Sequence, residues 1–254
     1  MSAPVTTNSE ELKTDPERYW NRAGEVSYSE AMFADSSVER HVNLRLWGTA
    51  AAIADQLGVP KEGRVLDLGC GDGAFANHAL RDYARVDGYD LAPAAIERAR
   101  ATAPGPNYHY DTADLIAFDY AALPRYDGVF MIGILHHIKQ AAPEIVAKIA
   151  ALSDSVIVLE PNGDNIMRKA LELTPAYKKA GEDSFRTKDL RAMFERAGYT
   201  TVVERRMNLF PNFTPGFLFK ALSPLEAHVE SNPVLRACCT VNMMGFSKTN
   251  APRP

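Results

Sequence analysis

Cysteine is scarce in this sequence, and its scarcity excludes several kinds of site. Only three cysteines occur in 254 residues: Cys70 stands alone, and Cys238 is followed directly by Cys239. The chain contains neither a CxxC pair nor the ligand spacing of a metal site. We therefore predict no bound metal, and we interpret the adjacent pair as small apolar core residues rather than as a redox site.

Long apolar runs are also missing. No run approaches the roughly 20 residues that a membrane helix needs, and residues 1–15 are polar, without the apolar centre of a signal peptide. An excess of positive charge is missing too: the net charge is −4 at pH 7, which gives no general attraction for nucleic acid. We expect a cytoplasmic protein, a monomer or homodimer, with neither a membrane span nor a nucleic-acid partner.

What the sequence does contain is a short apolar run that ends in a glycine-rich turn. The run Val65-Leu66-Asp67-Leu68 is followed by Gly69-Cys70-Gly71-Asp72-Gly73, and a helical pattern begins at Ala74. Strand, glycine turn and helix are typical of α/β folds that bind nucleotides, and glycine lets a ligand approach the backbone closely. Asp67 is a poor neighbour for a pyrophosphate. It suits a cation, such as the ammonium of an amino-acid cofactor.

Apolar runs and helical patterns alternate beyond this motif. The pattern predicts an α/β fold: a doubly wound, Rossmann-like sheet of about seven strands, with an N-terminal helical segment and helical insertions after strands five and six. We expect a disordered tail over 1–15, a helical lid over 16–60, and a core over 61–254 with insertions at 161–186 and 207–236. The expected strands are Val65–Leu68, Arg85–Asp90, Tyr108–Asp111, Asp127–Ile132, Ser155–Glu160, Thr200–Arg205 and Thr240–Ser247.

Three acids follow the first three expected strands, where a nucleoside cofactor needs them. Asp67 ends the first strand, and Asp90 ends the second, about 20 residues past the glycine turn, a spacing typical of a carboxylate that accepts ribose hydroxyls. Asp114 follows the third strand and suits the amine of an adenine, with Leu91 and Leu115 against its ring. Together the acids indicate an adenosine that bears an amino acid.

These segments resemble the class I S-adenosylmethionine-dependent methyltransferases. Val65–Gly73 resembles motif I of that family, Asp90 its acid after the second strand, and Ala113-Asp114-Leu115 its adenine-contacting motif. Tyr126–Met131 resembles the fourth strand. The following Ile134-Leu135-His136-His137-Ile138 is similar to the leucine–histidine–histidine segment of the ubiquinone- and menaquinone-type branch.

The resemblance covers about residues 60–205, and Pro215–Lys248 is similar to the tail of small-molecule methyltransferases. It implies S-adenosyl-L-methionine as the cofactor and methyl transfer to a small-molecule acceptor held in line with the sulfur–methyl bond. We expect the acceptor to be apolar or aromatic in part, such as a natural product, a lipid or a quinone-like molecule. The expected cofactor-binding residues are Asp67, Gly69, Cys70, Gly71, Asp90, Leu91, Ala113, Asp114, Leu115 and Met131.

Catalytic candidates follow the fourth and fifth strands. His137, and after it His136, is a candidate general base, although each also suits a helix start at which a histidine bonds backbone carbonyls. Glu160 suits either an acceptor hydroxyl or amine, or a cap on the following turn. Candidate residues of the acceptor pocket are Tyr19, Tyr28, His41, Tyr177 and Arg186.

Two other functions stay open at this point. A nicotinamide-dependent oxidoreductase shares the fold, although its pyrophosphate favours GxGxxG without an acid in the strand. A non-catalytic protein that binds S-adenosylmethionine keeps the same motif without a reaction. The apolar stretch Leu209–Phe219 suits a hydrophobic acceptor, and equally burial against the N-terminal helices or a dimer partner.

Overall fold

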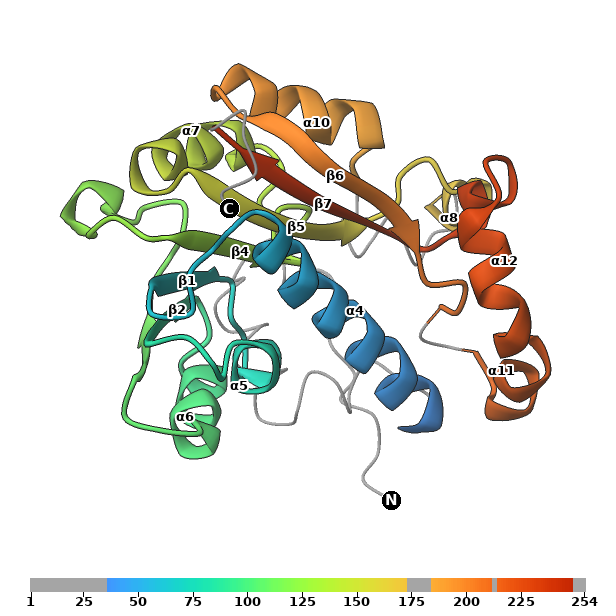
Figure 1. Cartoon of the computed structure of the whole chain (residues 1–254), viewed down its shortest axis with the longest axis horizontal. Helices are drawn as coiled ribbons and strands as arrows, with labels where there is room; N and C mark the ends of the chain where they lie inside the picture. The colour runs from blue at the N-terminus through green and yellow to red at the C-terminus, as the bar shows by residue number, and fades with distance from the viewer. Residues whose placement is uncertain (1–35, 173–183, 212–213, 249–254) are drawn as a thin grey trace.

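The computed structural model describes residues 36–172, 184–211 and 214–248. Its centre is a seven-stranded sheet in the order β3-β2-β1-β4-β5-β7-β6 (Figure 1). All neighbours pair in parallel except β7, which is antiparallel to both β5 and β6. The strands are β1 (Arg64–Leu68), β2 (Arg85–Asp90), β3 (Tyr108–Thr112), β4 (Gly128–Ile132), β5 (Ser155–Pro161), β6 (Thr200–Met207) and β7 (Val241–Ser247).

Helices cover both faces of the sheet (Figure 1). On one face lie α4 (Ser36–Gln56), α5 (Ala74–Ala79) and α6 (Pro93–Thr102), and on the other lie α7 (Ala142–Leu152) and α10 (Thr187–Arg196). A third group stands near the end of β6: α8 (Ile166–Glu172), α11 (Gly216–Leu222) and α12 (Glu226–Ser231), with the short 3-10 turns η2 (Ser223–Leu225) and η3 (Leu235–Cys238). No helix in the described ranges is long and apolar enough to cross a membrane.

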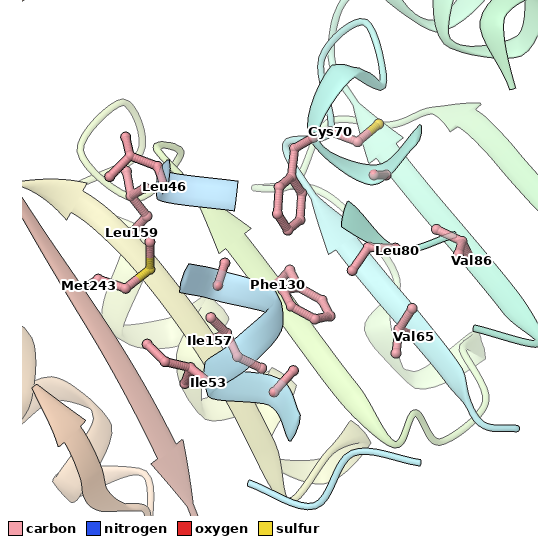
Figure 2. Packing of buried hydrophobic residues seen from close by; sticks show 14 of the residues in the cluster. Leu46, Ile53, Val65, Cys70, Leu80, Val86, Phe130, Ile157, Leu159 and Met243 are labelled. Carbon is pink, nitrogen blue, oxygen red and sulfur yellow. The ribbon is translucent and has the colours of Figure 1, made fainter. Parts of the chain in front are cut away.

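The apolar core forms two layers because the side chains of each strand alternate between the two faces. In β5, Ile157 and Leu159 belong to the layer under α4, while Val156 and Val158 belong to the layer under α7 and α10. A strand buried on both faces is continuously apolar, and the run Val156–Leu159 is fully explained in this way. Figure 2 shows the first layer, where Leu46 and Ile53 of α4 lie beside the strand residues.

The predicted doubly wound, Rossmann-like fold of about seven strands is confirmed. The bounds of β2 are those expected, and those of the other six strands differ by one or two residues. The described part of the expected lid, residues 36–56, is one helix whose apolar side packs on β5 and β7. It braces the sheet. The predicted insertions contain α8 in one case, and α11 and α12 in the other.

Candidate active site

The carboxyl ends of β1, β2 and β4 meet around the glycine turn. Gly69 N and Cys70 N both donate to the carbonyl of Tyr89, at 2.8 and 3.1 Å, so the turn closes against the end of β2. Gly69 has φ +73°, and a Cβ there would lie 2.5 Å from the side chain of Ile134. Only glycine satisfies both conditions. The close approach brings the turn after β4 directly against the turn after β1.

Asp67 is buried without a partner. Its side chain, near the end of β1, belongs to a residue with 1% of its surface exposed, and neither carboxylate oxygen has a hydrogen bond. Burial, and after it the charge of Asp90, raises the pKa of Asp67 to about 8. An unpartnered buried carboxyl group is costly, and a cationic group placed beside it would satisfy both oxygens.

Asp90 holds the turn from the end of β2. One of its oxygens accepts from Gly71 N at 2.9 Å and the other from Ala92 N at 3.0 Å, and Ala113 N donates to its carbonyl at 2.8 Å. Burial raises the pKa of Asp90, while the backbone donors Ala92 and Gly71 oppose that shift. The residue therefore positions the glycine turn, in addition to any contact it makes with a ribose.

Asp114, the third acid, and the apolar residues expected to contact the cofactor differ from one another in burial. Asp114 is exposed, and its Oδ1 accepts from Ile116 N at 2.9 Å, while Leu91 is half-buried. Leu115 and Met131 lie in the apolar layer under α7 and α10, with 5% and 0% of their surface exposed. The Met131 side chain packs into the core, because it points to the same face as Val129, and its contact with a cofactor stays a prediction.

Glu160 anchors the turn that follows β4. The fully buried carboxylate accepts from Leu135 N at 2.7 Å and from His136 N at 3.2 Å, and it pairs with His136 Nδ1 at 2.8 Å. An ionised carboxylate only accepts, so Nδ1 carries the proton and Nε2 is the basic ring nitrogen. Both oxygens of Glu160 hold this turn, and its contact with an acceptor stays a prediction.

His137 differs in its surroundings from His136. The two rings lie 3.9 Å apart between centroids. His137 remains exposed on part of its surface. The pKa of His137 is nevertheless lowered well below the ordinary value, first by desolvation of the ring by nearby protein atoms and then by the charges of His136 and Arg168. His137 is therefore neutral at pH 7. The structure thus gives one histidine a carboxylate partner and leaves the other in contact with solvent.

Two of the expected pocket residues lie in the described part of the chain. His41 Nε2 lies 2.8 Å from Glu226 Oε2, and its ring is 4.9 Å from that of Phe219, so it joins α4 to the C-terminal helices. Arg186 is exposed and precedes the first turn of α10. The acceptor contacts expected of both side chains stay predictions. Tyr19, Tyr28 and Tyr177 lie outside the described residues.

The polar turn after β5 contains residues that the sequence motifs did not identify. Asn162 and Asn165 donate through Nδ2 to the carbonyl of Cys239, at 2.9 and 3.0 Å. Asp164 accepts from the hydroxyl of Thr187 at 2.7 Å and pairs with Arg206 at 2.9 Å. The asparagines bind the segment that enters β7. Their signal in the sequence was only a density of turn-forming residues.

Comparisons with known proteins agree with this geometry. A family model described as a methyltransferase domain matches residues 40–204. No curated protein matches the sequence. Among solved structures, magnesium protoporphyrin IX methyltransferase from Synechocystis is 16% identical, with a TM-score of 0.65, covering 93% of this chain and 100% of that one.

Two further structures show how widely this fold is used. A putative sarcosine dimethylglycine methyltransferase from Galdieria sulphuraria is 15% identical, with a TM-score of 0.62, covering 84% of this chain and 88% of that one. A putative RNA methyltransferase from Pyrococcus horikoshii is 16% identical, with a TM-score of 0.51, covering 81% and 82%. At these identities the likeness establishes the fold, and the acceptor must be argued from the chain itself.

Proposed function

This chain belongs to the methyltransferase domain family, and on that premise we propose that it methylates a small-molecule acceptor that is apolar or aromatic in part. It is an S-adenosylmethionine-dependent methyltransferase. Family membership replaces the oxidoreductase alternative, while a binding protein without catalysis is an outcome that the experiments below separate. The leucine–histidine–histidine segment supports the ubiquinone-type branch as part of the proposal.

The unpartnered carboxyl group of Asp67 is the observation that carries this proposal. A buried acid with two unsatisfied oxygens fits the ammonium of the cofactor's methionine portion. Gly69 and Gly71 let that portion approach the backbone. In the proposal Asp90 accepts the ribose hydroxyls, and Asp114 accepts the adenine amine beside Leu91. The residues present therefore fit the group, and they share one edge of the sheet.

In this proposal the turn after β4, which contains His136 and His137, contacts the acceptor. When bound, S-adenosylmethionine supplies a methyl group activated by a positively charged sulfur. The chain then has to orient the acceptor and, for a neutral acceptor, take up one proton. We assign the proton to Nε2 of His136, because Glu160 accepts from Nδ1 and orients that ring. Glu160 is the positioning residue. The contact of Ile134 with the glycine turn keeps His136 and Glu160 near the cofactor in this proposal.

Several features support a small acceptor over a nucleic acid. The net charge is −4, which opposes binding to a polyanion. Phe210 and Phe219 pack edge to face at 5.0 Å beside His41, so part of the aromatic insertion is used in joining α4 to the C-terminal helices. Phe217 remains exposed and is available to an apolar molecule. Two of the structures reported above are named for small-molecule acceptors.

Transfer of a tritiated methyl group tests the proposed function directly. The purified protein is incubated with methyl-labelled S-adenosylmethionine and a panel of phenols, quinols, porphyrins, amines and short RNAs, and the label in each product is counted. We expect label in an apolar or aromatic small molecule. Label in RNA alone would contradict the proposed acceptor class. Tight cofactor binding with no labelled product across the panel would favour the non-catalytic alternative.

Replacing His136 is expected to separate chemistry from folding. His136→Asn keeps a donor for Glu160 but removes the basic nitrogen, so kcat for a neutral acceptor from the panel should fall about 100-fold or more, with little change in the KM of the cofactor. His137→Asn is the matched control, and we expect it to change kcat less than about 10-fold. Steady-state kinetics with both variants measure the difference. Near-normal turnover of His136→Asn would show that positioning alone suffices.

A further inference from the structure

At the starts of β1 and β2, away from the glycine turn, one face of the sheet has charged side chains that are partly exposed. The connection from β3 to β4, residues 113–127, contains only the 3-10 turn η1 (Tyr120–Ala122), so it places no helix over this face. A cavity of about 610 Å³ reaches from this region to the edge strand β3, lined by strand residues, by the segment before β4 and by Arg100 of α6. Figure 1 shows α5 and α6 at the same end of the sheet, and their apolar residues belong to the layer on the opposite face.

Charged side chains gather on this face because alternate residues of each strand point to the same side of the sheet. Val86 of β2 points into the apolar layer under α4, and Asp87, the next residue, points to the other face. Arg64 of β1 and Arg85 of β2 are paired in the strand register. In β1 the alternate residue Leu66 belongs to the layer under α7 and α10. Arg64 therefore lies on the same face as Asp87.

Two guanidinium groups share one buried carboxylate in this cavity. Arg85 Nε lies 2.8 Å from Asp87 Oδ1, and Arg64 Nε lies 3.1 Å from Asp87 Oδ2. Tyr126 also donates its hydroxyl to Asp87 Oδ2 at 3.0 Å. The Asp87 side chain is 6% exposed, whereas those of Arg64 and Arg85 are 33% and 38% exposed. The shared carboxylate thus fixes both arginines by their inner nitrogens.

The outer ends of these arginines keep their binding capacity. Within the described ranges, the terminal amino groups of Arg64 and Arg85 have no hydrogen-bond partner. The nearby Asp127 does not use them, since its Oδ2 accepts from the backbone N of Arg64 at 2.9 Å. The cavity lining as a whole holds three arginines, including Arg100, against two aspartates. One positive charge is therefore left without a carboxylate in the lining.

We propose that this cavity binds a phosphoryl group of a small molecule between the terminal amino groups of Arg64 and Arg85. A tetrahedral oxyanion offers oxygens to two guanidinium ends at once, which is the geometry arginine serves best. Both side chains are already held by Asp87, so little further ordering is required on binding. Tyr89 is half-buried, lines the same cavity and offers an aromatic ring to the organic part of the ligand.

This second site is separate from the cofactor cleft. Arg64 and Arg85 begin their strands, whereas Asp67 and Asp90 lie at or near the ends of the same strands. Asp67 lies three positions after Arg64 in β1, about 10 Å along the strand. The proposal therefore does not depend on the identity of the acceptor.

Calorimetric titration with inorganic phosphate and with pyrophosphate tests the second site. Saturating S-adenosylhomocysteine is present throughout, to occupy the cofactor cleft. We expect saturable binding by the unmodified protein, at least tenfold weaker binding by Arg85→Gln, and unchanged binding by Arg191→Gln. Arg191 is the matched control, because it pairs with Glu204 on the surface away from this cavity. Thermal unfolding checks that each variant is folded.

A conservative variant and a second anion complete the test. Arg85→Lys keeps the charge but loses the forked end, so it should bind pyrophosphate less tightly than the unmodified protein even if Arg85→Gln fails to fold. Acetate, a planar carboxylate, should bind at least tenfold more weakly than phosphate. The proposal is overturned if the unmodified protein shows no saturable phosphate binding, if the Arg85 variants bind as it does, or if acetate binds equally well.

Discussion

Asp67→Asn is expected to lose cofactor affinity and, at the same time, to make the ligand-free protein more stable at alkaline pH. The amide has nearly the shape of the carboxylate but cannot balance an ammonium. Removing one partner of a buried charged pair costs about 2–5 kcal/mol, which corresponds to roughly thirtyfold to several thousandfold in Kd. Calorimetry with S-adenosylmethionine and S-adenosylhomocysteine measures this loss.

The stability change follows from the raised pKa of Asp67, about 8 in the folded chain against an ordinary value near 4. The folded state holds this proton more tightly than the unfolded state does. The resulting contribution to stability is complete below about pH 4 and is lost as the pH rises through about 8. Asparagine has no proton to lose. The Tm of Asp67→Asn should therefore fall less between pH 6 and pH 9 than that of the unmodified protein.

A surface acid provides the control for this comparison. Asp55 forms an exposed pair with Lys61 at 2.5 Å, so Asp55→Asn should leave both cofactor affinity and the pH dependence of Tm nearly unchanged. If Asp67→Asn binds the cofactor normally, the assignment of the ammonium to Asp67 is wrong. If its Tm changes with pH as the unmodified protein's does, the buried acid is already ionised at neutral pH.

Glu160→Gln is expected to lower the stability of the fold by about 2–4 kcal/mol, the scale of lost hydrogen bonds to a buried charge. The carboxylate serves three donors: Leu135 N, His136 N and His136 Nδ1. A glutamine oxygen can replace one carboxylate oxygen, but its NH₂ group then faces a backbone N–H. Chemical denaturation measures the loss as a lower midpoint at unchanged m-value.

A matched surface variant and a kinetic measurement complete this test. Glu144 is exposed and pairs with Lys148, so Glu144→Gln should leave the denaturation midpoint nearly unchanged. Because Glu160 orients His136, Glu160→Gln should also lower kcat under conditions where the variant is folded. The fold-change in kcat should exceed the fold-change in the KM of the cofactor. Unchanged stability together with unchanged kcat would refute its role as an anchor.

The parts of the fold that follow local rules could be predicted from the sequence. The continuous run in β5 predicts burial on both faces, and Val156–Leu159 is divided between the two apolar layers. The glycine turn was recognisable because three glycines follow an apolar run, and all three adopt positive φ. The reversed direction of β7 was not expected, since an apolar strand has the same pattern in either direction.

The side-chain partners of the site could not be predicted, because they join residues distant in sequence. His41 and Glu226 are 185 residues apart, and His136 and Glu160 are 24 apart. A lone histidine or glutamate gives no signal of its partner. The sequence alone therefore predicts a pocket role for His41 and either an acceptor or a capping role for Glu160, whereas in the structure each side chain is hydrogen-bonded to a distant partner. The buried Asp67 was identified correctly as unusual, because an acid in an apolar strand is itself a local signal.

We propose that the buried carboxyl group of Asp67 receives the ammonium of the methyl donor. Counting protons during binding tests it most directly, by calorimetric titration of the protein with S-adenosylmethionine at pH 7 in two buffers of different ionisation enthalpy. With a pKa of about 8, Asp67 is mostly protonated before binding and must give up its proton to pair with the ammonium. The account predicts release of close to one proton at pH 7, less at pH 9, and none for Asp67→Asn. Binding without proton release at pH 7, or equal release by Asp67→Asn, would contradict it.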